Sequence, residues 1–155
     1  MSRAQELIDE HTECICDHRY TYKSAVIWGA IKSDSLAVLE ALAAAGVYLY
    51  TIYSSTKPSI SIVVNGVTNI RKTGASIVYA LESLGYPIEA WTTKDNPSAR
   101  ELACKPADKL ELLVWLYPDG DKCKFKVVAT KEEIVQRDVY ELDCPEDNAE
   151  EEATL

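Results

Sequence analysis

Hydrophobic and polar positions are most regularly patterned in residues 24–85. Two segments carry apolar residues three or four positions apart, the spacing of one helix face. Leu36, Leu39 and Leu42 mark the first. The other segments are rich in β-branched and aromatic residues, as strands are. The pattern predicts a strand at 24–31, a helix within 33–46, strands at 47–55 and 58–66, a helix at 70–84 and a strand at 87–93.

This order of elements, β-α-β-β-α-β, is that of the split βαβ, or ferredoxin-like, unit. A weak internal repeat agrees with it, because Gly46 and Gly85 close the two predicted helices at equivalent positions. We therefore predict an α+β fold whose core, at residues 24–93, is a ferredoxin-like βαββαβ sandwich.

The flanking residues predict additions to this core. Residues 2–12 favour a short amphipathic helix, and residues 1–23 serve as helix and connector. Residues 94–107 are polar and predict a loop with one helical turn. Residues 110–117 and 122–128 predict a β-hairpin around Asp119 and Gly120, a strong turn pair, although 110–117 also suits a buried helix. A helical turn at 131–136 and a strand at 138–142 complete an extension over 94–143, and residues 144–155 predict a disordered acidic tail.

The composition describes a chain with enough apolar residues for a core. Of its 155 residues, 47% are hydrophobic, and no apolar run approaches the roughly 20 residues of a membrane span. The first residues are polar and acidic, unlike a signal peptide. We expect a soluble, cytoplasmic protein of one domain that does not bind membranes.

The net charge of −9 is concentrated near the end of the sequence. No basic residue follows Arg137, and seven carboxylates lie between Glu141 and Glu152. Such a tail either keeps the protein soluble or docks onto a basic partner. Because the sequence has no basic stripe, we expect no direct binding of nucleic acid.

A cluster near the start of the chain combines imidazole and thiol groups. It consists of His11, Cys14, Cys16 and His18. These groups suit Zn²⁺, although the spacing matches no established zinc motif. A junction with half-buried cysteines and a Cys-His catalytic pair are the alternatives. Five cysteines are an odd number, which argues against a closed disulfide framework and for reduced thiols.

Three sequence segments resemble an ACT domain of the aspartokinase type. They are LAVLEALAAAG, VYLYTIYSS and STKPSISIVVNG, and the resemblance extends over residues 24–85. ACT domains are regulatory modules that bind amino acids or similar small molecules, and they pair side by side with ligands at the interface. The resemblance therefore implies a homodimer and no catalytic activity.

The resemblance also implies where a ligand would bind. The ligand loop of the family falls on residues 30–35 and faces the strand start of the partner subunit, which corresponds to residues 47–49. A serine-containing turn falls on residues 54–56. The implied ligand-binding residues are Lys32, Ser33, Asp34, Val47, Tyr48, Leu49, Ser55 and Thr56. Independently, the aromatic strand suggests an interface with a second subunit, formed by Tyr48, Tyr50 and Tyr53.

Three classes of function follow from these patterns. The first is a small, dimeric, ACT-like regulatory or interaction module, without cofactor, that senses an amino acid. The second is an acidic inhibitor or adaptor that binds a protein partner through the aromatic strand and the tail. The third is a zinc- or thiol-dependent activity at the cluster of histidines and cysteines.

Overall fold

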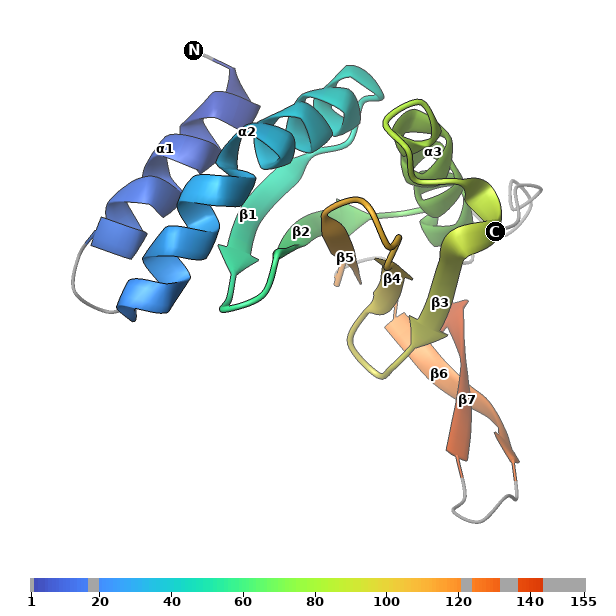
Figure 1. Cartoon of the computed structure of the whole chain (residues 1–155). Helices are drawn as coiled ribbons and strands as arrows, with labels where there is room; N and C mark the ends of the chain where they lie inside the picture. Colours follow the sequence, from blue (N-terminus) through green and yellow to red (C-terminus); the bar gives the residue numbers. More distant parts are fainter. Residues whose placement is uncertain (1, 17–19, 121–123, 132–136, 144–155) are drawn as a thin grey trace.

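The computed structural model describes residues 2–16, 20–120, 124–131 and 137–143. These residues form the helices α1 (Arg3–Cys16), α2 (Tyr22–Ala44) and α3 (Ile70–Glu82), and a short 3-10 helix at Ile88–Ala90. The strands are β1 (Leu49–Ser54), β2 (Ser59–Val67), β3 (Trp91–Asp95), β4 (Arg100–Cys104), β5 (Glu111–Pro118), β6 (Lys124–Lys131) and β7 (Arg137–Asp143). Figure 1 shows their arrangement.

The first five strands form one mixed sheet in the order β1-β2-β5-β4-β3. Strand β2 runs parallel to β5, and the other neighbours are antiparallel. The chain leaves β2 through α3, forms the β3–β4 hairpin and then returns as β5 beside β2. The central strands β2 and β5 thus come from segments about 50 residues apart.

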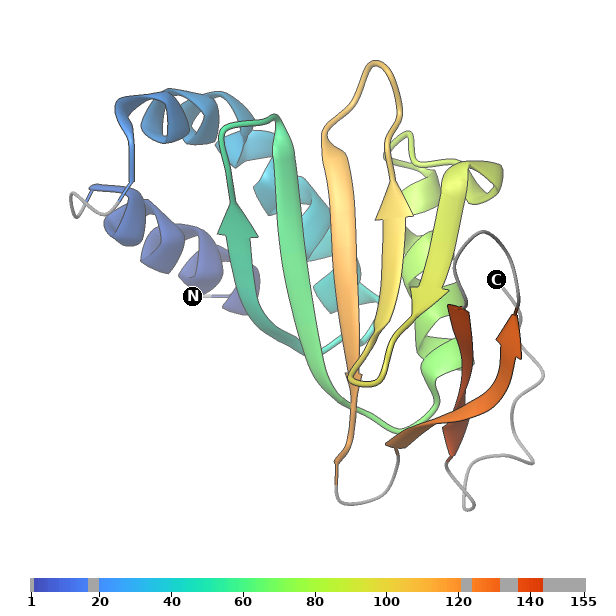
Figure 2. The same ribbon diagram turned by 90° about the horizontal axis from the view of Figure 1, so that it is seen from below.

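The three helices cover one face of this sheet, so the sheet and the helices form two layers (Figures 1 and 2). Alternate residues of β2 and β5 are buried, as expected of strands with one face against helices. Between the layers lies the core, whose largest fully buried side chains include Leu39, Leu42, Ile60, Ile62, Ile77, Leu81, Leu102 and Leu112.

The largest error of the sequence interpretation concerns residues 24–31, which are helical and not a strand. The Thr21 hydroxyl accepts a hydrogen bond from the Ser24 N–H and caps the start of α2. The predicted loop at 30–35 is also helical, and the Ser35 hydroxyl donates to the Ile31 carbonyl at 2.8 Å. A short apolar run cannot by itself distinguish a strand from a buried helix. None of the described helices is both long and apolar enough to cross a membrane.

The second group of corrections concerns residues 94–128. Residues 100–104, predicted as loop, form β4, which is joined to β3 by a turn in which the Asn96 side chain accepts from the N–H groups of Ser98 and Ala99. The strand predicted at 110–117 is confirmed as β5 from Glu111 onwards, and the alternative of a buried helix is wrong. The predicted pairing of 110–117 with 122–128 is wrong, because β5 pairs with β2 and β4, and β6 pairs with β7.

The α+β class is confirmed, whereas the finer ferredoxin-like order is not. Helix replaces the first strand of the predicted βαββαβ unit, and β4 and β5 share a sheet with β1 and β2. The predicted helices at 2–12 and 70–84 and the strands at 47–55, 58–66 and 138–142 are confirmed within a few residues. The helix predicted within 33–46 is only the second half of α2, which begins already at Tyr22. The strand predicted at 87–93 is confirmed only from Trp91 onwards, because Ile88–Ala90 form a 3-10 helix. The helical turn predicted at 131–136 lies largely outside the described residues. The acidic tail predicted at 144–155 lies wholly outside them.

Candidate functional site

The face of the sheet opposite the helices carries two rows of side chains in register across all five strands. Directly paired residues on neighbouring strands point to the same face. The first row consists of Thr51, Val63, Trp115, Glu101 and Lys94, and the second of Tyr53, Ser61, Leu113, Ala103 and Thr92. No described helix covers this face (Figure 2), and we call it the open face.

Apolar and aromatic groups occupy the centre of the open face. Val63 and Trp115 are paired neighbours, and Leu113 follows on the same side of β5. All three are half-buried, whereas Tyr53, at the β1 end of its row, is 54% exposed. A solvated sheet face is normally polar at alternate positions, so this apolar centre is the feature of the sheet that requires an explanation.

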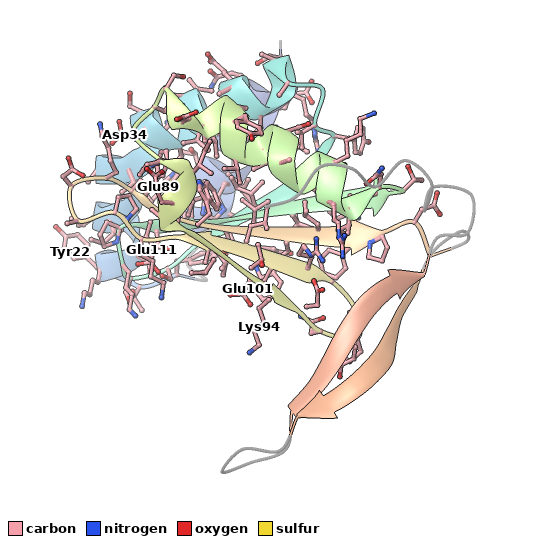
Figure 3. The ribbon with its side chains drawn as sticks, turned by 90° about the vertical axis from the view of Figure 1, so that its right-hand side faces the viewer. Tyr22, Asp34, Glu89, Lys94, Glu101 and Glu111 are labelled. Atoms are coloured by element: carbon pink, nitrogen blue, oxygen red, sulfur yellow. The ribbon has the colours of Figure 1, made fainter. Side chains whose placement is uncertain are left out.

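The charges on and beside the open face balance each other. Lys94 and Glu101 are cross-strand partners, and they project from the sheet away from the helices (Figure 3). Just after β4 and at the start of β5, the Lys105 Nζ lies 3.6 Å from a carboxylate oxygen of Glu111. Two cations therefore face two anions, although the whole chain carries a net charge of −9.

Helix α1 covers the outer edge of β1. The Arg3 guanidinium donates to the main-chain oxygens of Leu49 (3.2 Å) and Tyr50 (2.7 Å), which an edge strand would otherwise leave free. At the far end of β1, the His11 Nε2 lies 2.6 Å from the Ser54 hydroxyl oxygen. These contacts hinder another strand from pairing with β1, so the open face remains the broader surface for contact.

The three tyrosines predicted as an interface do not form one surface. Tyr53 lies on the open face, and Tyr50 stands at a bulge in β1. Tyr48, which precedes β1 and is 70% exposed, lines a small hollow beside Gly46 and Lys72. Regular alternation would place Tyr50 and Tyr53 on opposite faces of the strand. The bulge between Leu49 and Thr51, which the sequence did not reveal, shifts this alternation so that Thr51 and Tyr53 lie on the open face.

The predicted ligand-binding residues are also spread over the molecule. Lys32, Ser33 and Asp34 lie in the middle of α2, and Val47 and Leu49 are buried. Val47 and Tyr48 precede β1, whereas the exposed residues Ser55 and Thr56 follow it, in the turn at its opposite end. Eight residues of extended chain span about 25 Å, so within one copy of the chain this set does not surround a single small ligand.

The predicted metal cluster is divided in the same way. His11 is buried against β1, whereas Cys14 and Cys16 are exposed on α1 with free thiols, and His18 lies outside the described residues. Within the described ranges, no group of three or more His, Cys, Asp or Glu side chains could hold a metal ion.

The environment of His11 explains its burial. Its ring lies edge-on to Trp28, with centroids 4.5 Å apart, and near Tyr20 at 6.0 Å. The Trp28 indole N–H donates to the Thr12 hydroxyl, which ties α2 to α1. Burial lowers the pKa of His11 below its ordinary value of 6.5, so its imidazole is neutral at pH 7.

Sequence reasoning missed the pair of His11 and Ser54, because 43 residues separate them. A hydroxyl beside an imidazole can form a nucleophile, but the imidazole then needs a third group to orient it and an oxyanion site nearby. Among the described residues, no carboxylate is bonded to His11. We therefore interpret the pair as a structural contact between α1 and β1.

Comparison with protein-family models, curated proteins and solved structures gives no match for this chain. Its function must therefore be inferred from its own surfaces. Of the surfaces described above, the open face combines the largest set of aligned apolar side chains with balanced charge.

Proposed function

We propose that the protein is a small, non-catalytic interaction module that forms a homodimer by packing the open faces of two copies against each other. The observation that carries this proposal is the apolar centre of the open face, formed by Val63, Leu113 and Trp115 with Tyr53 beside it. Covering these side chains removes apolar surface from water, which is the main driving force of association.

The size of the open face suits such a dimer. Five strands about 4.8 Å apart, each contributing about six residues of about 3.3 Å, span roughly 24 by 20 Å. This is about 500 Å² on each copy and about 1,000 Å² for two, which is near the lower limit of a specific protein interface. Two sheets can pack face to face at about 10 Å, with their inner side chains interdigitated.

Charge favours a second copy as the occupant. Lys94 and Lys105 balance Glu101 and Glu111, so two open faces meet without net repulsion, whereas the rest of the chain is acidic. In the proposed dimer, Lys94 of one subunit can also lie near Glu101 of the other subunit. The ligand position that the ACT resemblance implies at residues 30–35 has no part in this proposal, because those residues are helical.

The test is the molar mass in solution, measured by light scattering over a concentration series. We expect a mass near 34 kDa, twice the 17.2 kDa of one chain. Tyr53→Asp and Leu113→Glu should shift the protein towards the monomer, because each buries an unpaired carboxylate in the interface.

Tyr79→Asp provides a matched control. Tyr79 is also an exposed tyrosine, at 62%, but it lies on α3 in the helical layer. This variant should remain a dimer. A monomeric wild type at every concentration, or equal loss of the dimer in the Tyr53 and Tyr79 variants, would contradict the proposal.

A further inference from the structure

A cavity of about 480 Å³ lies between α2, the residues that follow α3, and the turns that join β1 to β2 and β4 to β5. Its apolar lining includes Ile31 and Val38 of α2, together with Leu84 and Leu110. Cavities of this size hold small organic ligands in other proteins. It is separate from the open face, since α2 and α3 lie in the helical layer (Figure 2).

Tyr86 places an unpartnered polar group at this cavity. The residue is 3% exposed. Its main-chain N–H donates to the Leu81 carbonyl, and its own carbonyl accepts from the Trp91 indole. The side-chain hydroxyl makes no hydrogen bond with the described residues.

The Tyr86 hydroxyl must therefore reach open space. Asn69 Nδ2 is the one side-chain polar atom of the described residues that is both fully enclosed and unpartnered. The Tyr86 hydroxyl is not such an atom, so it is not fully enclosed, and Tyr86 is one of the residues that line the cavity. Burial, followed by the electrostatic effects of Asp34 and Cys104, raises the pKa of Tyr86 to about 12. The phenol thus keeps its proton and can both donate and accept.

Two carboxylates at the cavity have no ion-pair partner among the described residues. Asp34 comes from α2, on the helical side of the sheet (Figure 3), and Asp108 from the turn before β5. Lys109 also lines the cavity, and its aliphatic chain lies across Gly85. Asp34 and Tyr86 line the same cavity, and the charge of Asp34 contributes to the raised pKa of the phenol.

We propose that this cavity binds a small organic amine with an apolar body. The ammonium group of the ligand would bind the Asp34 carboxylate and donate to the Tyr86 hydroxyl. Its apolar body would lie against Ile31, Val38 and Leu110. The two carboxylates exceed the one lysine, which favours a cation over an anion.

Isotope-labelled protein titrated with phenethylamine at pH 7, and followed by NMR, tests this proposal. Saturable shifts are expected at residues 31–38, 86 and 107–110. Asp34→Asn should weaken binding about tenfold or more, because it removes a charge-assisted hydrogen bond. Tyr86→Phe keeps the ring and removes the hydroxyl, and should weaken binding several-fold. The similarly sized anion 3-phenylpropionate should not bind.

Glu40→Gln is the matched control, since Glu40 is an exposed carboxylate on α2 that does not line the cavity. It should bind phenethylamine as the wild type does, and so should the dimer variant Tyr53→Asp. The proposal is overturned if phenethylamine gives no saturable shifts, if 3-phenylpropionate binds equally well, or if Asp34→Asn leaves the affinity unchanged.

Discussion

Two glycines with similar backbones but different surroundings allow a steric contact to be measured. Gly46 and Gly85 follow α2 and α3, and both have positive φ, at 83° and 96°. A Cβ at Gly46 would meet nothing within 4 Å. A Cβ at Gly85 would lie 2.7 Å from the Lys109 Cε. Substitution by alanine therefore adds the same backbone strain at both positions and a side-chain clash at only one.

The expected magnitudes follow from this difference. Left-handed backbone costs a residue with a Cβ roughly 1–2 kcal/mol, and this is the expected loss of stability in Gly46→Ala. In Gly85→Ala, Lys109 must also leave its position, which adds about 0.5–1.5 kcal/mol if it takes a poorer rotamer. Gly85→Ala should therefore lose about 1.5–3.5 kcal/mol in all.

Urea denaturation, followed by tryptophan fluorescence, measures these changes in the free energy of unfolding. The double variant Gly85→Ala, Lys109→Ala removes the clash and keeps the backbone strain. Compared with Lys109→Ala alone, it should lose only about as much stability as Gly46→Ala does. Both single variants should keep the slope of the wild type, since the surface exposed on unfolding is the same.

Equal losses in Gly46→Ala and Gly85→Ala would refute the reasoning, because they would show that the lysine chain yields without cost. A full loss that persists in the double variant would refute it in another way. In that case the backbone at Gly85, and not its contact with Lys109, would carry the whole effect.

Two further predictions concern the core and the buried histidine. Leu112→Ala, at a fully buried position of the central strand β5, should cost about 2–5 kcal/mol of stability in the same urea assay, and a loss below about 1 kcal/mol would show that the core refills the cavity. Because the folded-state pKa of His11 is lowered, the unfolded chain binds more protons as pH falls through 6.5. The stability from a neutral His11 is present above that pH and is lost as pH falls towards the folded-state pKa. His11→Gln should therefore reduce the loss of stability between pH 7 and 5.5. An unchanged pH profile of stability in this variant would contradict this account.

Local patterns predicted most elements because each one carries its own signal. The stripe at Leu36, Leu39 and Leu42 lies on the buried side of α2, and the β-branched run at residues 60–64 lies in β2. The signal failed where it was short. Residues 24–28 are mostly apolar without an obvious period, and only the longer spacing of Trp28, Ile31 and Val38 shows that one helix continues through them.

The candidate sites depended on contacts between distant segments and were predicted less well. Asp34 is the member of the predicted ligand set that lines the larger cavity, and Tyr86, which the sequence analysis did not select, supplies its free hydroxyl. An isolated tyrosine has no local signal for such a role. Its importance arises because α2 and the turn before β5 meet beside it.

The sequence by itself determined the α+β class, the helical stripes and the alternation that buries one face of β2, because these depend on neighbours along the chain. Only the tertiary structure decided that β5 lies parallel beside β2, that all three helices cover one face, and that the opposite face keeps Val63 and Trp115 at the surface. The order of the strands and the face that the helices cover depend on which segments pack together. The packing of these segments minimises the exposed apolar surface of the whole chain and not of any one segment.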